Sequence, residues 1–289
     1  MREYENEHTF HNAIALAVKG DKDSLFVVME GEDDSFLLKH WVGDSIRIMP
    51  GRGGKGNVIQ VAEKFALRGQ NRVKFVIDRD YDAFSLRMVE YPSNVISSSN
   101  HDCFVDVVAA HARLLPLVVD YHLDSARRSG GKRAADLANV SVDDIVGMGF
   151  ELASMLAACR IVDFRYSLGL EFKRFKYGGK PFDRFSASYI MQRIIELNKR
   201  SELNIDKYCK KAERVLCEVR DCSFPPVGDH DLFSALNYVV SLYSRAPSEK
   251  VLRLSVLSSL SVEILRKIWW CKSLEDWCSS HEVDFFAQR

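Results

Sequence analysis

The stretch Ser24-Leu-Phe-Val-Val-Met-Glu30 decides the fold of the N-terminal part of the chain. It is a short, continuous apolar run that ends in an acid. Such a run is typical of a strand buried on both faces, as in parallel sheets. The stretch Val73-Lys-Phe-Val-Ile-Asp78 repeats the same pattern further along the chain. We therefore predict two buried strands, each with a carboxylate at its carboxyl end.

Helical patterns alternate with these strands over roughly 100 residues. Apolar residues at helical spacing predict helices at 8–19, 33–41, 57–67 and 103–117, and shorter apolar runs predict strands at 45–49 and 94–97. Alternation of this kind indicates a mainly parallel sheet with helices on its faces. In such sheets, functional groups gather where the strands end at their carboxyl edge.

Strand signals become rare after residue 120. Helices are predicted at 142–161, 187–200, 203–218, 230–244, 248–269 and 273–281, and the aromatic, basic stretch 164–186 is expected to hold a hairpin. The chain of 289 residues is long enough for two domains. We expect an α/β domain at 1–120 and a mostly α-helical domain at 121–289.

Charge is balanced overall, with 40 basic and 40 acidic residues, so no global basicity indicates a nucleic-acid partner. The two halves differ: residues 1–110 contain 13 basic and 17 acidic residues, a net charge of −4, whereas the 27 and 23 that follow give +4. This split suits an acidic metal-binding half and a basic half that holds a polyanion. Ordinary scatter of surface charge explains an offset of this size equally well.

Several features indicate a soluble, cytoplasmic protein. The seven cysteines form no CxxC pair and are expected to be reduced and mostly buried. The polar, acidic start MREYENEHTF does not resemble a signal peptide. No uninterrupted apolar run approaches the roughly 20 residues that a bilayer-spanning helix needs, so no membrane is expected as a partner.

Two acidic clusters carry the candidate chemistry. Glu30 ends the first strand, and Asp78, Asp80 and Asp82 end and follow a later one. Convergent carboxylates are hard oxygen ligands suited to Mg²⁺ or Mn²⁺. Strand alternation would turn Asp78 and Asp80 to the same side of the sheet edge. The alternative is that such acids are solvated or cap helices, which fits Asp33 or Asp34 of the first cluster.

This order of motifs resembles the TOPRIM domain of topoisomerases, bacterial primases and OLD-family nucleases. The shared pattern is an apolar strand ending in Glu-Gly, a helix, and a later strand ending in Asp-X-Asp, and it covers about residues 22–115. The resemblance implies that Glu30 is the general acid/base or a metal ligand. It also implies that Asp78 and Asp80 bind metal, with Asp82 in an auxiliary role.

The whole chain resembles a family of TOPRIM proteins that includes the nuclease effectors of the PARIS anti-phage defence system. The resemblance lies in VVMEGEDDSFLLKHW (27–41), VIDRDYD (76–82), SSSNHDCFVDVV (97–108) and Gly228-Asp-His-Asp-Leu232. It implies a toxic, Mg²⁺-dependent endonuclease that cleaves transfer RNA and is held inactive by an ABC-type ATPase partner. A further acid is expected after the fourth strand, where this chain has Asp102 and Asp106 but no Glu. Whether a second metal site exists is therefore undecided, and so is a homodimer in the active state.

Other functions remain open on the residues alone. The substrate could be DNA, and a TOPRIM-like domain could be a non-catalytic binding module. The loop Gly51-Arg-Gly-Gly-Lys-Gly56 matches GxGxxG, follows a strand and opens a helix, which is the pattern of a Rossmann-type dinucleotide-binding enzyme. Against that function, Asp78 is accompanied by two more acids, which a ribose does not need. We favour phosphate contacts by Arg52 and Lys55, with a plain glycine turn as the equal alternative.

Two basic stretches are candidates for binding nucleic acid. The first, an expected exposed loop at 127–133, contains Arg127, Arg128, Lys132 and Arg133, and the second contains Lys173, Arg174 and Lys176. Aromatic residues alternate with the second set and could stack on unpaired bases, although aromatics at this spacing are more often core. His230, between two aspartates, is either a proton shuttle or, more commonly for such a residue, part of a helix start.

Overall fold

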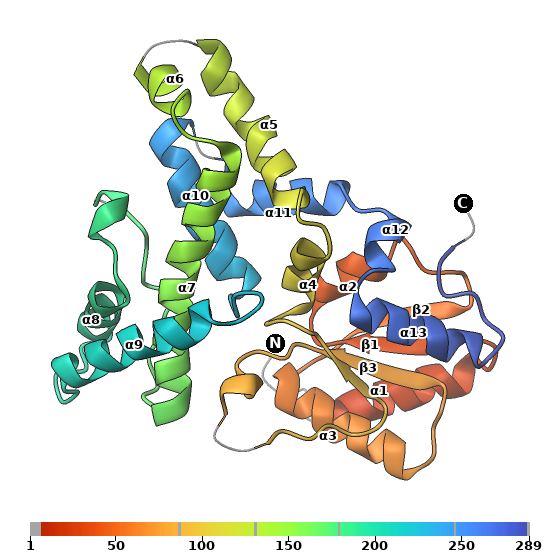
Figure 1. Ribbon diagram of the computed structural model, residues 1–289. Helices are drawn as coiled ribbons and strands as arrows, with labels where there is room; N and C mark the ends of the chain where they lie inside the picture. Colours follow the sequence, from red (N-terminus) through yellow and green to blue (C-terminus); the bar gives the residue numbers. More distant parts are fainter. Residues whose placement is uncertain (1–6, 86–87, 130–131, 179, 246, 288–289) are drawn as a thin grey trace. The chain divides into compact units, whose positions relative to one another are not determined.

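The computed structural model describes residues 7–85, 88–129, 132–178, 180–245 and 247–287 (Figure 1). The chain forms two compact units, as expected, but each unit is discontinuous. Unit 1 comprises Met1–Arg79, Val89–Ala110 and Leu260–Arg289. Unit 2 comprises Asp80–Met88 and His111–Ser259. The boundary expected at residue 120 therefore differs from the observed division, since the last 30 residues return to unit 1.

Unit 1 is built on a four-stranded, all-parallel sheet, which confirms the α/β class (Figure 1). The four predicted strands are all present, as β1 (Leu25–Met29), β2 (Ile46–Pro50), β3 (Val73–Ile77) and β4 (Val95–Ser97). Their order in the sheet is β2-β1-β3-β4. The two strands that end in acids, β1 and β3, are therefore neighbours at the centre of the sheet.

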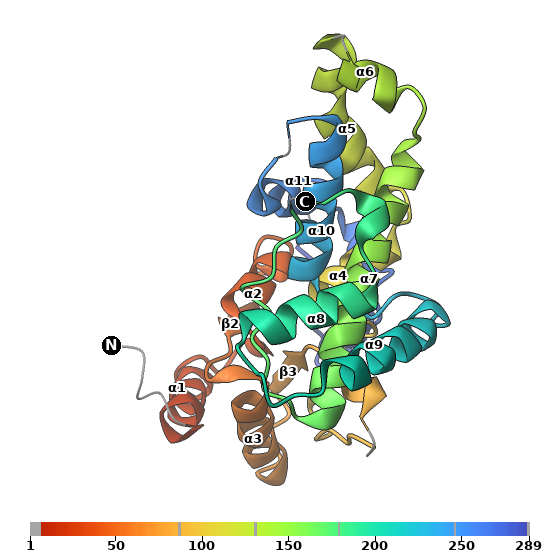
Figure 2. The same cartoon turned by 90° about the vertical axis from the view of Figure 1, so that its left-hand side faces the viewer.

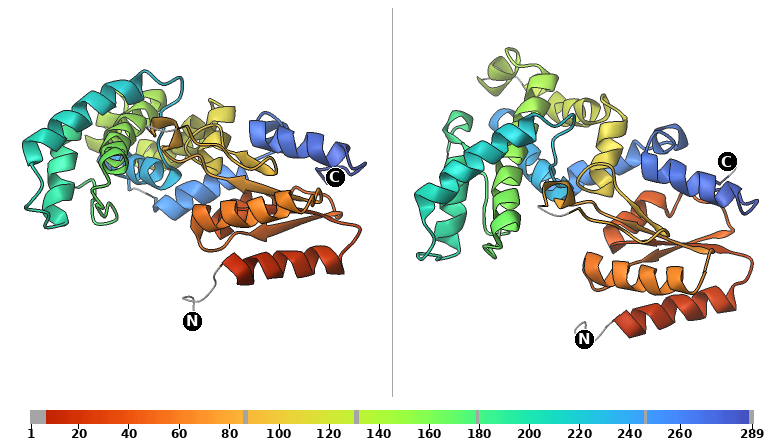
Figure 3. Two further views of the ribbon diagram at one scale, coloured as in Figure 1. Left: turned by 90° about the horizontal axis from the view of Figure 1, so that it is seen from below. Right: turned by 60° about the horizontal axis from the view of Figure 1, so that its bottom comes forward.

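Helices α1 (Glu7–Gly20) and α3 (Gly54–Leu67) cover one face of this sheet, as the views in Figure 3 show. Alternate strand residues such as Phe26 and Val28 of β1 meet Val61 and Phe65 of α3 in one buried cluster. Burying a side chain of this size contributes about 1.5–3 kcal/mol. The alternation that defines a strand and the spacing that defines an amphipathic helix thus converge on a shared core.

The other face carries α2 (Glu32–Leu38), α4 (Cys103–Ala110), α12 (Val262–Leu265) and α13 (Trp269–Ser279). Figure 3 shows α13 on the side of the sheet opposite α1 and α3. Two predicted helices were too long. The 103–117 helix divides into α4 and α5 (Leu114–Ser129), because Pro116 fits only the first turn of a helix. The 248–269 helix divides at Ser261, whose side chain caps α12.

The end of the chain packs against the segment between α2 and β2. Val42 and Phe286 form an antiparallel bridge. The Gly43 amide donates to the Phe285 carbonyl at 2.9 Å, and the Ala287 amide donates to the Trp41 carbonyl at 2.8 Å. These backbone pairs explain why the C-terminal segment belongs to unit 1.

Unit 2 contains helices joined by turns and irregular segments, and no strand among the residues that the structure describes. Its longest helix, α7 (Val142–Tyr166), packs against α5, α8 (Ala187–Leu197), α9 (Ile205–Arg220) and α10 (Asp229–Tyr243) (Figure 2). The unit also contains α6 (Lys132–Leu137), α11 (Glu249–Ser258) and the short 3₁₀ helices η1 (Asp82–Phe84) and η2 (Phe182–Arg184). Helix α7 is long and apolar enough to cross a membrane, but 72% of its most apolar window is buried. Most of that apolar window therefore lies in the core of unit 2.

The predicted hairpin at 164–186 is wrong for the residues that the structure describes there. The stretch contains the end of α7, turns and η2, but no strand. Phe172, Phe175 and Tyr177 are buried in the core of unit 2. Their alternation with basic residues reflects alternate burial along an irregular segment, and this pattern mimics that of a strand.

Candidate functional site

The carboxyl ends of β1 and β3 bring two of the predicted site residues together. In the parallel register Met29 pairs with Val76, so both strands end at the same edge of the sheet. Glu30 follows β1, and its Oε2 accepts a hydrogen bond from the Asp78 amide at 3.0 Å. The expected convergence of Glu30 and Asp78 is therefore observed.

The carboxylate of Asp78 is held at the start of α4. Its Oδ1 accepts a hydrogen bond from the Cys103 amide at 2.9 Å. Burial is the main cause that raises the pKa of Asp78, and the carboxylates of Asp34, Asp102 and Glu30 raise it further. The Cys103 amide acts in the opposite direction, but the resulting pKa is about 9. Burial, with the neighbouring carboxylates adding to it, therefore favours the protonated form of Asp78 at neutral pH.

Three further acids at this edge lie in, or directly before, the helices that follow β1 and β4. Asp34, in the first turn of α2, accepts from the Gly31 amide at 3.1 Å. Asp102 precedes α4 and accepts from the Val105 amide at 2.7 Å. Asp106 accepts from the amides of Ser99 and Asn100 at 2.7 and 2.8 Å, and burial raises its pKa. Each carboxylate thus accepts from backbone N–H groups.

Sequence reasoning treated Asp34 as a capping residue only. The capping role is observed in one direction only: Asp34 accepts from the amide of the N-cap residue Gly31, which has no side chain to accept in return. Its effect on the pKa of Asp78 was missed. The signal was present in the run from Glu30 to Asp34: a helix that starts within two residues of a strand's carboxyl end places its first-turn acids at that same edge.

The expectation for Asp80 and Asp82 requires a correction. Strand β3 ends at Ile77, and Asp80 has a φ of 51°, in the left-handed region. Strand alternation therefore does not extend to Asp80 and cannot be used to place its side chain beside that of Asp78. Asp80 begins a segment of unit 2, and Asp82 begins η1 in that unit.

The donor set at the edge of unit 1 suits a hard divalent cation. Glu30, Asp34, Asp78 and Asp102 offer carboxylate oxygens, which Mg²⁺ and Mn²⁺ prefer. Within the ranges that the structure describes, no three His, Cys, Asp or Glu side chains stand in a metal-binding arrangement. Each of these carboxylates accepts a hydrogen bond from a different backbone amide. The residues fit a cation by chemistry and by position at one edge.

The glycine loop after β2 lies against the same edge. The Gly51 amide donates to the Met29 carbonyl at 2.5 Å, and a Cβ on Gly51 would come within 2.5 Å of the Glu30 carbonyl. Gly53 has a φ of 78°, in the left-handed region that favours glycine, so the backbone needs glycine at this turn. Lys55 reaches the other central strand, where its Nζ donates to the Arg79 carbonyl at 3.0 Å. Arg52 is exposed.

The same geometry disfavours a dinucleotide site. In the dinucleotide pattern the glycine loop follows the first strand, and the ribose-binding acid ends the strand after it. Here the loop follows the edge strand β2, and Asp78 ends β3, with β1 between them. Two strand spacings, about 10 Å, therefore separate the loop's strand from the acid's strand.

The first basic stretch is not a loop over the residues that the structure describes. Arg127 and Arg128 lie in the last turn of α5, and Lys132 and Arg133 begin α6; only residues 130–131, outside the described part, separate the two helices. Arg127 pairs with Asp120 at 2.5 Å and Arg128 with Asp124 at 2.5 Å. Arg127 and Arg128 therefore end a helix and pair with acids of that same helix.

The second basic stretch remains exposed, but its aromatic partners do not. Lys173, Arg174 and Lys176 are exposed, and Arg174 lies 3.4 Å from Glu171. The neighbouring rings Phe172, Phe175 and Tyr177 are buried, as in the core alternative. Stacking of bases on these rings is therefore excluded in this arrangement. The lysines and the arginine keep the chemistry needed for phosphate contacts.

His230 is exposed in the first turn of α10, while the aspartates on either side of it are buried. Asp231 binds Arg160 through two hydrogen bonds of 2.6 and 2.8 Å. Asp229 pairs with Arg253 at 2.8 Å. The Gly228–Leu232 motif therefore joins three helices of unit 2, and the helix-start interpretation of His230 fits better than the proton shuttle.

Comparison with known proteins finds no relative of this chain. No family model, no curated protein and no solved structure matches the chain.

Proposed function

We propose that the carboxyl edge of the unit 1 sheet is the centre of a Mg²⁺- or Mn²⁺-dependent endonuclease. The observation that carries the proposal is the convergence of Glu30 and Asp78 at neighbouring strand ends. The rise of the pKa of Asp78 to about 9 is caused first by burial and then by the neighbouring carboxylates. It supports the proposal, because a divalent cation would offset both costs of ionising this group. Binding a cation would let Asp78 ionise at neutral pH.

The chain's own residues then have distinct roles. Asp78 would bind the cation directly, and Asp34 and Asp102 would add negative charge around it. Glu30 would act as a ligand or as the general acid/base, as the TOPRIM resemblance implies. Asp80 and Asp82 are carried into the proposal by that resemblance alone. A bound Mg²⁺ supplies a polarised phosphate and an activated water.

The substrate proposal rests on the family resemblance and on the basic surfaces of the chain. Arg52, Lys173, Arg174 and Lys176 are cations suited to phosphate contacts. We propose an RNA substrate, with transfer RNA as the preferred form and DNA as the alternative. We also propose that the protein acts in the cytoplasm as a toxic anti-phage effector. An ABC-type ATPase partner would hold it inactive, and its active form would be a homodimer.

The test is expression of the full chain with Mg²⁺ or Mn²⁺, followed by inspection of total RNA and plasmid DNA for breaks. We expect RNA breaks with the native chain and a loss of at least about 100-fold with Glu30→Gln, as for removal of a general acid/base. Glu63→Gln is the matched control, because Glu63 is exposed on α3. Equal cleavage by Glu30→Gln would remove Glu30 from the mechanism.

A direct binding measurement separates the nuclease from a non-catalytic module. Calorimetric titration of the purified chain with Mn²⁺ should show binding that Asp78→Asn weakens. Absence of both Mn²⁺ binding and cleavage would favour a module whose acids serve only to cap α2 and α4.

A further inference from the structure

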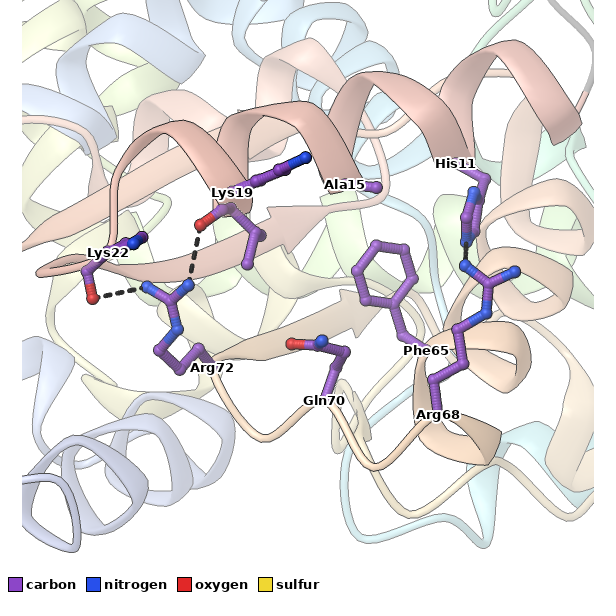
Figure 4. A pocket seen from close by; sticks show the side chains of 9 residues that line it. His11, Ala15, Lys19, Lys22, Phe65, Arg68, Gln70 and Arg72 are labelled. Carbon is purple, nitrogen blue, oxygen red and sulfur yellow. Dashed lines mark hydrogen bonds between the residues drawn. The ribbon is translucent and has the colours of Figure 1, made fainter.

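A cavity lies in unit 1, between α1, the end of α3 and the loop that leads into β3. Its volume is about 580 Å³, within the usual range for small-molecule sites. Ala15, Val18 and Phe65 form an apolar floor. Basic and amide side chains surround this floor: Lys19, Lys22, Arg68, Arg72 and Gln70 (Figure 4). None of the nine lining residues is acidic.

Arg72 gives one wall of the cavity a fixed positive charge. Its Nη1 donates to the carbonyls of Asp21, Lys22 and Ser24, and its Nη2 donates to that of Val18 at 2.7 Å. These carbonyls lie at or just after the end of α1, where a helix carries partial negative charge. Arg72 therefore satisfies the groups that would otherwise repel an anion from this end of the cavity.

The opposite wall is also held in place. Arg68 Nη1 lies 3.2 Å from His11 Nε2, and His11 Nδ1 lies 3.2 Å from Asn12 Oδ1. The Arg68 guanidinium has only donors, so in this contact His11 Nε2 is the acceptor. His11 also packs on Phe65, with ring centroids 5.0 Å apart. Figure 4 shows Phe65 and Gln70 between the Arg72 and Arg68 side chains.

Two lysines complete the rim with cations that can move. Lys19 and Lys22 are exposed, and neither forms an ion pair or a side-chain hydrogen bond with another residue of the described part of the chain. Long lysine side chains reorient easily toward a phosphate. The cavity thus combines an apolar floor, one amide and a rim of four cations.

We infer that this cavity binds a nucleoside monophosphate. The phosphate would lie between Lys19 and Lys22, whose charges match it, and the apolar floor would contact the base and ribose. Gln70 offers both a donor and an acceptor to a base edge, and the Arg68 guanidinium offers a plane for stacking.

The site is separate from the acidic edge. Lys22 and Arg72 precede β1 and β3, whereas Glu30 and Asp78 follow these strands. A five-residue strand spans about 16 Å, so ligands at the two ends of the sheet do not touch. The inference therefore does not depend on the proposed nuclease activity.

The test is isothermal titration of the full chain with adenosine 5′-monophosphate, with adenosine and inorganic phosphate as partial probes. The nucleotide should bind at least tenfold more tightly than either probe. Lys19→Gln with Lys22→Gln should weaken its binding at least tenfold, whereas Lys39→Gln, an exposed lysine on α2's C-cap, should not. Ala15→Leu should fill the floor and weaken binding, while Ala13→Leu on the exposed side of α1 should not.

Any of the following outcomes would overturn the inference: no binding of the nucleotide at millimolar concentration, equal binding by the lysine double variant, equal affinity for adenosine, or equal affinity for inorganic phosphate. A melting curve of each variant checks that the fold is retained. Tighter binding of a 5′-phosphorylated oligonucleotide than of the free nucleotide would also overturn it, because the ligand would then be a nucleic-acid end.

Discussion

Carboxylates are stabilised differently in the two units. At the edge of the unit 1 sheet, Asp34, Asp78 and Asp102 accept hydrogen bonds from backbone amides at the starts of helices. In unit 2, Asp229 and Asp231 bind the guanidinium groups of Arg253 and Arg160. A backbone amide orients a carboxylate but leaves its negative charge, whereas a guanidinium orients the carboxylate and also neutralises its charge. The first arrangement suits a site that recruits a cation, and the second suits a structural joint.

The largest expected effect is at Asp78, where one substitution should lower cleavage activity but raise the stability of the fold. Asp78→Asn should lower cleavage by about 1,000-fold, because it removes a metal ligand. The same variant should unfold at a higher temperature than the native chain without metal, because an amide avoids the cost of ionising a buried carboxyl. Cleavage assays and melting curves measure the two effects. A variant that loses both activity and stability would contradict the contrast.

The matching change in unit 2 should affect stability strongly. Asp231→Asn leaves the guanidinium of Arg160 without its charged partner and should cost about 3 kcal/mol in the free energy of unfolding. Asp124→Asn, which breaks the exposed pair with Arg128, should change it little. Urea unfolding curves provide the measurement. If both substitutions cost the same, the buried pair has no special structural role.

The pH dependence of unfolding tests the amide-held carboxylates. Asp78 has a pKa of about 9 in the folded state and 3.8 as its ordinary value, so between these values the folded state binds the extra proton. Its contribution to stability is complete below pH 4 and is lost as the pH rises to 9. The free energy of unfolding of the metal-free native chain should fall by about 3 kcal/mol between pH 6 and 8 relative to that of Asp78→Asn. Parallel curves for the two chains would contradict this pKa.

Mg²⁺ should act most strongly at high pH. It binds the ionised carboxylates, so its stabilising effect on the native chain should be larger at pH 8 than at pH 6. Melting temperatures with and without Mg²⁺ measure this difference. Asp78→Asn should show a smaller increase at both values of pH.

The smallest effect concerns the close approach of the glycine loop to the acidic edge. Gly51→Ala places a Cβ within 2.5 Å of the Glu30 carbonyl and should cost about 1–3 kcal/mol. Gly56→Ala meets no atom within 4 Å and should stabilise the chain by about 0.5–1 kcal/mol. Urea unfolding of both variants measures these opposite signs. A neutral Gly51→Ala would show that the loop can move away from β1.

The central strands were predictable because burial on both faces gives an uninterrupted apolar run, as in β1 and β3. The meeting of Glu30 with Asp78 followed from the parallel sheet. The division into units was not predictable, since the pairing of Trp41 with Ala287 depends on backbone groups that carry no sequence signal. The backbone at Asp80 was not predictable, because a left-handed residue within Asp-X-Asp is not visible from residue types.

The discontinuity of unit 1 has a consequence for biosynthesis. The segment Leu260–Arg289 follows nearly all of unit 2 in the chain, yet it supplies α12, α13 and the backbone partner of Val42. A growing polypeptide therefore completes this unit only when its last helix leaves the ribosome. Products that stop within the helical unit would lack that cover, so premature termination should release chains prone to proteolysis.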